Sequence, residues 1–127
     1  MKDKTVLIVD DNKNNLKLAG EIVRSLGLKT IEATDAKSAI ALARERLPDL
    51  ILMDIQLPGM GGMEAIRILK NDDRTRHIPI IALTSLAMNG DKKKIMASGC
   101  DAYLAKPFRF DDFVNAVEGL LGEKTNG

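Results

Sequence analysis

The chain alternates between short apolar runs and longer stretches in which apolar residues recur every three or four positions. Short runs rich in β-branched residues are typical of strands, and the three-to-four spacing is typical of helices with one buried face. The sequence therefore predicts strands at residues 5–9, 30–33, 50–54, 79–84 and 102–105, and helices at about residues 12–26, 36–47, 63–69, 87–98 and 110–121.

Residues that favour helix ends stand at most of the predicted boundaries. Asp10-Asp11-Asn12 and Thr34-Asp35 can cap helix N-termini, while Gly27 and Pro48 end the first two helices. The apolar face of the second helix is expected to run to Leu47. The apolar faces of the last two helices are predicted as Met88, Ile95 and Met96, and as Phe110, Phe113, Val114, Val117 and Leu121.

Strict alternation of strands and helices predicts an α/β fold with right-handed crossovers and a parallel sheet covered on both faces. Residues 51–53 are all apolar, as in a central strand with both faces buried, whereas residues 30–33 suggest a peripheral strand. Five strands suit the flavodoxin-like doubly wound order 2-1-3-4-5. The length predicts a single domain over residues 1–127, with a core at about 5–121 and a flexible tail at 122–127.

Charge and cysteine content narrow the function classes. Nineteen basic and eighteen acidic residues give a net charge of +1, which offers no field for nucleic acid or for an anionic membrane. The N-terminus has neither a signal peptide's apolar region nor a membrane span. The only cysteine, Cys100, cannot form an internal disulfide and suits a reducing compartment. We therefore expect a cytoplasmic protein.

Polar residues follow the apolar runs in four of the five predicted strands. Asp10 and Asp11 follow the first, Asp54 ends the third, Thr84 ends the fourth and Lys106 follows the fifth. In the predicted order these carboxyl ends meet at one edge of the sheet, where α/β proteins bind ligands. Either aspartate motif alone could be a helix cap, but the whole set in register favours a site.

Three carboxylates in one cleft repel each other by roughly 4 kcal/mol per pair at 4 Å and an effective dielectric constant of 20. One lysine does not offset that repulsion, so the site favours a cation. An all-oxygen ligand set indicates Mg²⁺, or Mn²⁺, rather than zinc. A metal beside an aspartate, a lysine and a threonine is typical of phosphoryl transfer, with Asp54 as the nucleophile and with Lys106 and Thr84 binding phosphoryl oxygens.

These motifs resemble the receiver domains of two-component response regulators. The likeness rests on Asp10-Asp11, on Asp54 with Pro58 four residues later, on Thr84-Ser85 and on Lys106-Pro107, and it covers residues 5–121. It implies that Asp54 is the phosphoacceptor, that Asp11 binds Mg²⁺ directly and Asp10 largely through water, and that Gln56 contributes its backbone carbonyl. It also implies a cis peptide at Lys106-Pro107 and a switch role for Tyr103 together with Thr84.

The loop after Asp54 departs from the family pattern, because Gly61-Gly62 stands where many receivers have Asp-Gly. We expect this change to alter loop mobility and phosphoryl lifetime while keeping the site. The stretch from Asp54 to Pro58 and the Gly90-Asp91 region are similar to stand-alone receivers of the DivK-like kind, and a chemotaxis-regulator-like protein is equally compatible.

The resemblance implies a signalling module that takes phosphate from a histidine kinase or phosphotransfer protein and changes a protein-binding face. Such a module is not a metabolic enzyme, but it catalyses its own phosphoryl transfer and slow dephosphorylation. It would act on a downstream protein, with no nucleic acid or membrane partner of its own. Alternatives are an N-terminal receiver excised from a longer regulator, a flavodoxin, which Asp10-Asp11 disfavours by repelling the flavin phosphate, and an aspartyl-phosphate phosphohydrolase. The sole histidine, His77, is not expected to take part.

Overall fold

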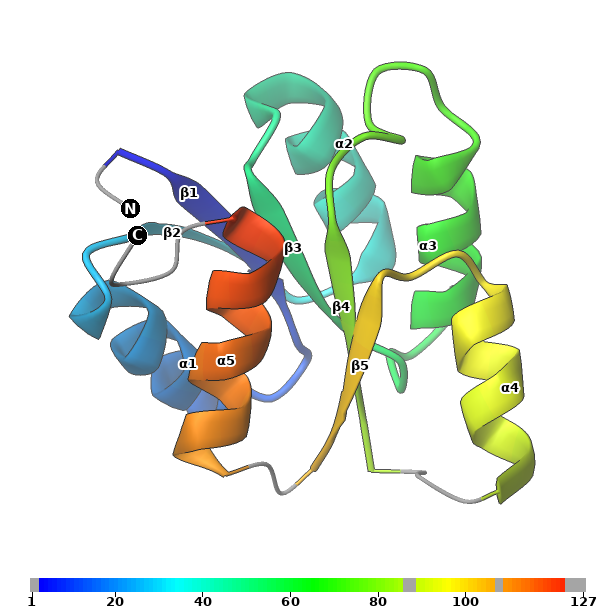
Figure 1. Ribbon diagram of the computed structural model, residues 1–127. Coiled ribbons are helices and arrows are strands. Elements are labelled where there is room, and N and C mark those ends of the chain that lie inside the picture. Colours follow the sequence, from blue (N-terminus) through cyan, green and yellow to red (C-terminus); the bar gives the residue numbers. More distant parts are fainter. Residues whose placement is uncertain (1–2, 86–88, 107–108, 123–127) are drawn as a thin grey trace.

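The computed structural model describes residues 3–85, 89–106 and 109–122, and it shows a parallel sheet between two layers of helices (Figure 1). The described elements follow in chain order as β1 (Thr5–Val9), α1 (Lys13–Ser25), β2 (Lys29–Ala33), α2 (Ala36–Arg46), β3 (Leu50–Asp54), α3 (Gly62–Lys70), β4 (Ile80–Thr84), α4 (Asn89–Ala97), β5 (Ala102–Ala105) and α5 (Phe110–Leu121).

The strand order is β2-β1-β3-β4-β5 and all four pairings are parallel, so the predicted flavodoxin-like order is confirmed. Every residue of β3 and β4 is buried, as expected for central strands covered on both faces. β2 lies at one edge, as its weaker pattern predicted, and β5 lies at the other.

Two apolar layers form the core, one on each face of the sheet. Successive residues of β1 alternate between them, with Leu7 and Val9 in one layer and Val6 and Ile8 in the other. Helices α2, α3 and α4 pack on the first layer, and α1 and α5 on the second (Figure 1). The helices thus hold the five strands from both sides and leave their carboxyl ends at a common edge.

Among the predicted cap residues, Asn12 and Asp35 are the N-caps of the first two helices. The Asn12 side chain accepts hydrogen bonds from the N–H groups of Asn14 and Asn15, at 2.8 and 3.1 Å. The Asp35 carboxylate accepts one from the Ser38 N–H at 2.7 Å, and this bond is the main reason why the pKa of Asp35 lies below its usual value. Such caps satisfy the free N–H groups of a first turn.

Three apolar residues placed on buried faces by the helical spacing are exposed instead, so these predictions were wrong. Leu47 is 52% exposed because the helix ends at Arg46 and Leu47 turns away in the left-handed conformation, with φ at 46°. Phe110 is 56% exposed as the first residue of α5, and Met96 is 40% exposed near the end of α4. An apolar stripe can continue beyond the part of a helix that the sheet covers, and its residues there are exposed.

Other differences concern element ends. β2 begins at Lys29 and β4 at Ile80, so Pro79 precedes its strand and only its carbonyl bonds to the sheet, accepting from the Ile51 N–H at 3.0 Å. The expected contact of Met88, the expected cis peptide at Lys106-Pro107 and residues 123–127 of the expected tail lie outside the described residues. Within the described ranges, no helix combines the length and the apolar character that a membrane span requires.

Candidate functional site

The predicted site residues converge on the carboxyl edge of the sheet. Val9 lies beside Met53 in the β1–β3 register, which brings Asp10 next to Asp54. On the other side, Asp54 pairs with Leu83 of β4 and Thr84 pairs with Ala105 of β5. Lys106 follows Ala105 directly, so four strand ends supply one group of polar side chains, as the sequence predicted.

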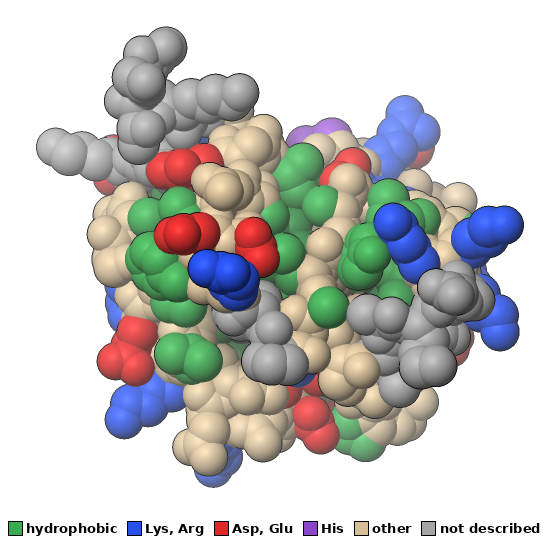
Figure 2. Space-filling model, turned by 60° about the horizontal axis from the view of Figure 1, so that its bottom comes forward, with side chains coloured by type: hydrophobic (Ala, Val, Ile, Leu, Met, Phe, Trp, Pro, Cys, Tyr) green, Lys and Arg blue, Asp and Glu red, His purple; other side chains and the backbone are tan. Residues whose placement is uncertain are grey.

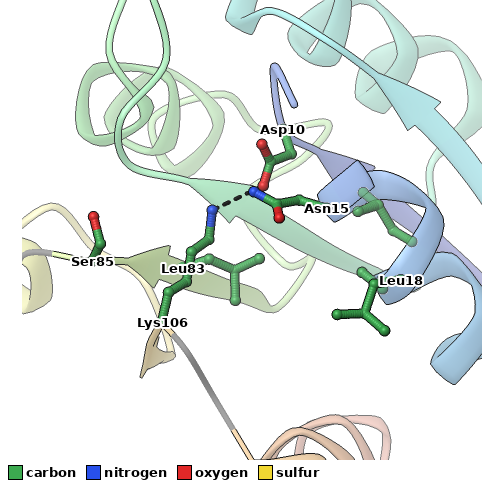
Figure 3. Close-up of a pocket in the computed structure, with 8 residues that line it drawn as sticks. Asp10, Asn15, Leu18, Leu83, Ser85 and Lys106 are labelled. Carbon is green, nitrogen blue, oxygen red and sulfur yellow. Dashed lines mark hydrogen bonds and ion pairs between the residues drawn. The ribbon is translucent and has the colours of Figure 1, made fainter. Parts of the chain in front are cut away.

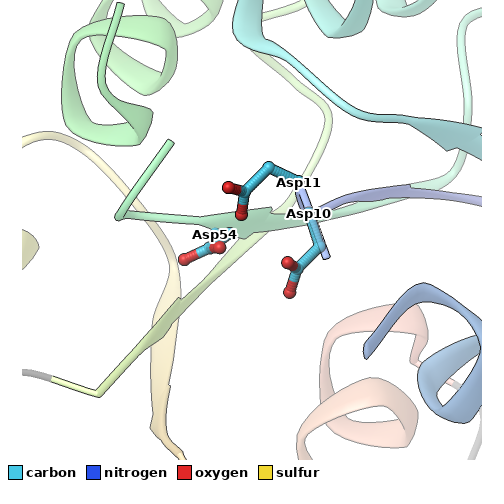
Figure 4. A group of neighbouring side chains, drawn as sticks. All are labelled: Asp10, Asp11 and Asp54. Carbon is cyan, nitrogen blue, oxygen red and sulfur yellow. The ribbon is translucent and has the colours of Figure 1, made fainter. Parts of the chain in front are cut away.

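The three aspartates form a compact acidic cluster. One carboxylate oxygen each from Asp10, Asp11 and Asp54 lies within 4.8 Å of the other two (Figure 4). Asp10 and Asp54 are buried, with 2% and 3% of their surface exposed, whereas Asp11 is exposed. The cluster thus has a desolvated floor and one carboxylate facing solvent. Its oxygen-only donor set fits Mg²⁺ or Mn²⁺.

The same local turn orients both buried carboxylates. Asp10 Oδ1 accepts a hydrogen bond from the Asn12 N–H, and Asp54 Oδ1 accepts one from the Gln56 N–H, each at 2.9 Å. Aspartate side chains commonly accept from the backbone two residues later. The turn fixes one oxygen of each carboxylate, and both Oδ2 atoms are left for other partners.

Lys106 forms ion pairs with both Oδ2 atoms. Its Nζ lies 2.9 Å from Asp10 Oδ2, to which it donates a hydrogen bond (Figure 3), and 3.5 Å from Asp54 Oδ2. The lysine therefore bridges the two buried carboxylates and lies closer to Asp10. One ammonium group lies beside three carboxylates, so the ionised cluster keeps an excess of negative charge.

Burial is the largest influence on Asp54 and raises the pKa of its carboxyl group. The Gln56 N–H and the Lys106 ammonium oppose this effect and favour the ionised form, while the neighbouring Asp10 raises the pKa further. The carboxylate that is best placed for chemistry is thus poorly hydrated and held by two donors.

Thr84 and Tyr103 lie on the same face of the sheet. Thr84 is fully buried and follows Ala82 by two residues, and Ala82 is the register partner of Tyr103. Side chains two apart on a strand share a face, so Thr84 is a diagonal neighbour of Tyr103. Tyr103 is half-buried against the apolar layer under α2, α3 and α4.

The glycine pair after Asp54 has two different structural roles. Gly61 is the N-cap of α3 and offers no side chain to cap it, so the acidic residue that many receivers have here would meet free N–H groups. Gly62 packs against the backbone of Asp54 and Ile55. A Cβ atom on Gly62 would lie 2.7 Å from the Ile55 Cα, so only glycine fits without a shift.

The sequence did not indicate the side-chain role of Gln56. Its Oε1 accepts hydrogen bonds from the Ser85 N–H, at 3.3 Å, and from the Ser85 hydroxyl. This bridge joins the loop after Asp54 to the residue after Thr84. No periodicity or motif in the sequence points to it, because it depends on the adjacency of β3 and β4.

The sequence also did not predict an apolar pocket of about 310 Å³ beside the Asp10–Lys106 pair (Figure 3). Asn15, Leu18 and Ala19 of α1 form one wall, and Leu83 and Ser85 contribute to the other. Leu18 is 54% exposed and falls outside the buried stripe of α1, so an apolar residue off the stripe was the available signal. Figure 2, which turns this edge forward, shows acidic side chains gathered beside a basic one, next to a hydrophobic area.

Two residues that the sequence set aside lie away from the cluster. His77 precedes β4, so it lies at the amino ends of the strands, opposite the cluster. Cys100 is buried, its thiol donates to the Ile95 carbonyl at 3.3 Å, and burial raises its pKa. This environment is typical of a small residue that packs in the core.

Known proteins resemble this chain in sequence and in fold. Residues 6–118 match the response regulator receiver domain family. The polar-differentiation response regulator DivK of Brucella anthropi is 46% identical over 120 residues, which cover 94% of this chain and 98% of that protein. A DivK of Brucella ovis is 45% identical over the same length.

Solved structures of other proteins have the same fold as this chain. The receiver domain of a sensor histidine kinase from Pseudomonas aeruginosa, with a magnesium ion coordinated in its active-site cleft, has a TM-score of 0.88 and 33% identity over 94% of this chain and 98% of its own. A chemotaxis response regulator of Vibrio cholerae has a TM-score of 0.86 and 25% identity, over 92% and 98% of the two chains. With these relatives and with the acidic cluster at the carboxyl edge of its sheet, the chain belongs to the response regulator receiver domain family of two-component signalling.

Proposed function

We propose that Asp54 accepts a phosphoryl group from a histidine kinase or histidine phosphotransfer protein, and that phosphorylation changes a face that binds a downstream protein. The observation that carries the proposal is the acidic cluster of Asp10, Asp11 and Asp54, whose oxygens lie within 4.8 Å of one another beside Lys106. Family membership establishes a phosphorylation-dependent signalling switch. The roles of single residues are the proposal.

Asp10, Asp11 and Asp54, together with the backbone carbonyl of Gln56, are the proposed ligands of Mg²⁺, with Mn²⁺ as a substitute. The donor set supports this assignment, since hard cations of this size prefer oxygen ligands and the repulsion among three carboxylates needs a positive charge. A cation bound here would neutralise charge on the phosphoryl oxygens during transfer.

In the proposed transfer, an Asp54 carboxylate oxygen attacks the phosphorus atom of a phosphohistidine. The new O–P bond forms as the P–N bond breaks, and the imidazole leaves with the electron pair. The Gln56 N–H and Lys106 favour the ionised, nucleophilic form of Asp54 against the effect of burial. Lys106 then lies within reach of the phosphoryl oxygens.

Thr84 and Tyr103 are the proposed switch residues. Thr84 already has an interaction partner in this structure, so a phosphoryl oxygen would have to compete for it or add to it. A shift of Thr84 toward Asp54 would open space on the face it shares with Tyr103, and the tyrosine ring would move toward that space. The surface of α4, β5 and α5 would then change shape for the downstream protein.

Further parts of the proposal come from the family and the sequence. Residues 1–127 are proposed to be one receiver domain in the cytoplasm, acting alone or as the N-terminal part of a longer regulator. The domain would catalyse both its own phosphorylation and a slow loss of the phosphoryl group, through the same cluster. The glycine at position 61, where many receivers have an acid, is proposed to set the phosphoryl lifetime through the loop after Asp54.

Mass spectrometry after incubation with a small-molecule acyl phosphate tests the central step. We expect one phosphoryl group per chain in Mg²⁺ and almost none in chelator. Asp54→Asn should abolish the labelling, and Asp73→Asn, which removes an exposed aspartate far from the cluster, should not. Labelling that persists in Asp54→Asn would contradict the assignment. Steady release of phosphate from phosphate esters would favour a phosphohydrolase instead.

A further inference from the structure

Lys92 of α4 lies over the ring of Tyr103. Its Nζ is 5.6 Å from the ring centroid, within the distance at which a cation is attracted to the face of an aromatic ring. Lys92 and Tyr103 belong to different elements, α4 and β5, and α4 and β5 are in direct contact. The pair therefore contributes a side-chain contact between the helix and the edge strand.

The helix that carries Lys92 is lightly anchored. Among its residues whose burial is described, only Ile95 is buried, and Met96 is 40% exposed. Lys92 precedes Ile95 by three positions, so the two lie on the same side of the helix. Lys92, Lys93 and Lys94 are all exposed and carry the same charge, and among the described contacts it is Lys92 that lies over the ring. Figure 2 shows basic side chains along the side of the molecule that α4 occupies.

Tyr103 has small neighbours in the direction of Thr84. Its register partner is Ala82, and Ala105, two residues later on the same face of β5, pairs with Thr84. Neither alanine offers the bulk to hold a ring in place from that side. In the described residues the group that faces the tyrosine ring with a specific attraction is the Lys92 ammonium.

We propose that Lys92 holds the ring of Tyr103 in the half-buried position seen here and thereby opposes the switch in the unphosphorylated protein. The inference rests on the proposed function of Tyr103 as a switch residue. If the ring moves toward Thr84, it leaves the ammonium group, so the attraction favours only the resting arrangement. A contact that is made in one state alone shifts the equilibrium between the two states.

Removal of the cation should make the resting protein sample the active arrangement more often. A cation–ring contact at a partly exposed site corresponds to about a two- to fivefold change in that population. Phosphorylation would then be needed less, and the protein would be partly active without it. Lys92 is thus a positioning residue for the switch and has no part in phosphoryl transfer.

The sequence provides a clean probe, because Tyr103 is the only tyrosine and there is no tryptophan. Tyrosine fluorescence and the NMR signals of the labelled ring therefore report on Tyr103 alone. Loss of the nearby charge would itself alter the ring signals, so the amide signals of Thr84 and Ala105 give the population. These amides are compared in Lys92→Met, Lys92→Arg and Lys93→Met, before and after treatment with acyl phosphate and Mg²⁺.

In unphosphorylated Lys92→Met we expect the two amide signals to move along the line from the resting to the phosphorylated wild-type positions, with about two to five times the wild-type active fraction. Lys92→Arg keeps a cation over the ring and should stay at the wild-type position, as should Lys93→Met. Lys92→Gln repeats the test if the methionine variant does not fold.

The outcomes separate this inference from the function on which it rests. If phosphorylation of the wild type leaves the NMR signals of the Tyr103 ring and of these amides unchanged, the proposed switch role of Thr84 and Tyr103 is wrong. If the wild type responds but Lys92→Met coincides with Lys93→Met, or moves off the line, Lys92 does not hold the switch and the inference is overturned.

Discussion

The Lys106 ammonium lies closer to Asp10 than to Asp54, at 2.9 Å against 3.5 Å. In the absence of phosphate, the main counter-ion of Lys106 is therefore the buried carboxylate of Asp10. This pairing has a consequence for stability, because the two buried aspartates are not equivalent. Removing the charge of Asp54 leaves the closer pair intact, whereas removing that of Asp10 deprives the lysine of its nearest partner.

Magnesium should stabilise the folded protein, since the proposed metal site is assembled only in the folded state. At a concentration one hundred times its Kd, the ion should raise the free energy of unfolding by about 2.7 kcal/mol and the melting temperature by roughly 10 °C. Without metal, Asp54→Asn should melt above the wild type because it relieves repulsion, and Asp10→Asn should gain less or lose stability. Thermal melts with and without Mg²⁺ measure this. Identical curves with and without the ion would contradict a metal site at the cluster.

Gly62→Ala should strongly destabilise the protein. Its Cβ would meet the backbone of Asp54 and Ile55, which cannot move without disturbing β3, so we expect a loss of about 1–3 kcal/mol or more, together with slower phosphorylation. Gly119→Ala is the matched control, because nothing lies within 4 Å of its Cβ on α5, and it should gain about 0.5–1 kcal/mol. Urea unfolding measures both. Equal stability of the two variants would show that the close approach at Gly62 is not limiting.

Thr84→Ala should still accept phosphate at Asp54, but phosphorylation should change the structure of residues 92–106 less than in the wild type. Thr84 is fully buried next to the cluster and on the face of Tyr103, so loss of its hydroxyl removes the proposed contact with the phosphoryl group. We expect smaller amide shifts over residues 92–106 on phosphorylation, measured by NMR, and near wild-type shifts in Thr84→Ser. Full-size shifts in the alanine variant would exclude Thr84 as the coupling residue.

Ionisation of Asp72 should make the stability of the folded protein depend on pH. Its carboxylate accepts from Arg74 and Arg44, and the hydrogen bonds from Arg74 are the main reason why its pKa is far below the usual range. Because the folded pKa is depressed, the contribution is complete above the unfolded pKa near 3.8 and is lost as the pH falls below that value toward the folded pKa. Asp72→Asn should thus be less stable than wild type at pH 7, and the difference in their free energies of unfolding should become smaller as the pH falls.

The neighbouring Asp73 provides the control for that measurement. It is 88% exposed and, among the described residues, its ion pair is with the exposed Arg76, so Asp73→Asn should change stability little at either pH. Chemical unfolding at pH 7 and at the lowest pH where the fold persists compares the variants. A gap for Asp72→Asn that stays constant across this range would mean that its ionisation is not what stabilises the α2–α3 connection.

The sequence by itself determined the element order, the parallel sheet and the five residues that meet at its carboxyl edge. These features follow from local chemistry: apolar runs such as residues 50–53 form central strands, caps such as Asp35 start helices, and a polar residue just after a strand lies at a known edge. The order 2-1-3-4-5 then makes Asp10, Asp54, Thr84 and Lys106 neighbours without any information on their distances.

Only the tertiary structure decided which of these groups pair and which apolar residues stay exposed. The Lys106–Asp10 pair and the Gln56–Ser85 bridge join elements far apart in sequence, and Lys92 lies over Tyr103 on the next element along the chain. All three distances depend on how strands and helices pack. Leu47 and Phe110 continue a helical stripe and are exposed nevertheless, because periodicity records which side of a helix is apolar and not where the covering sheet ends.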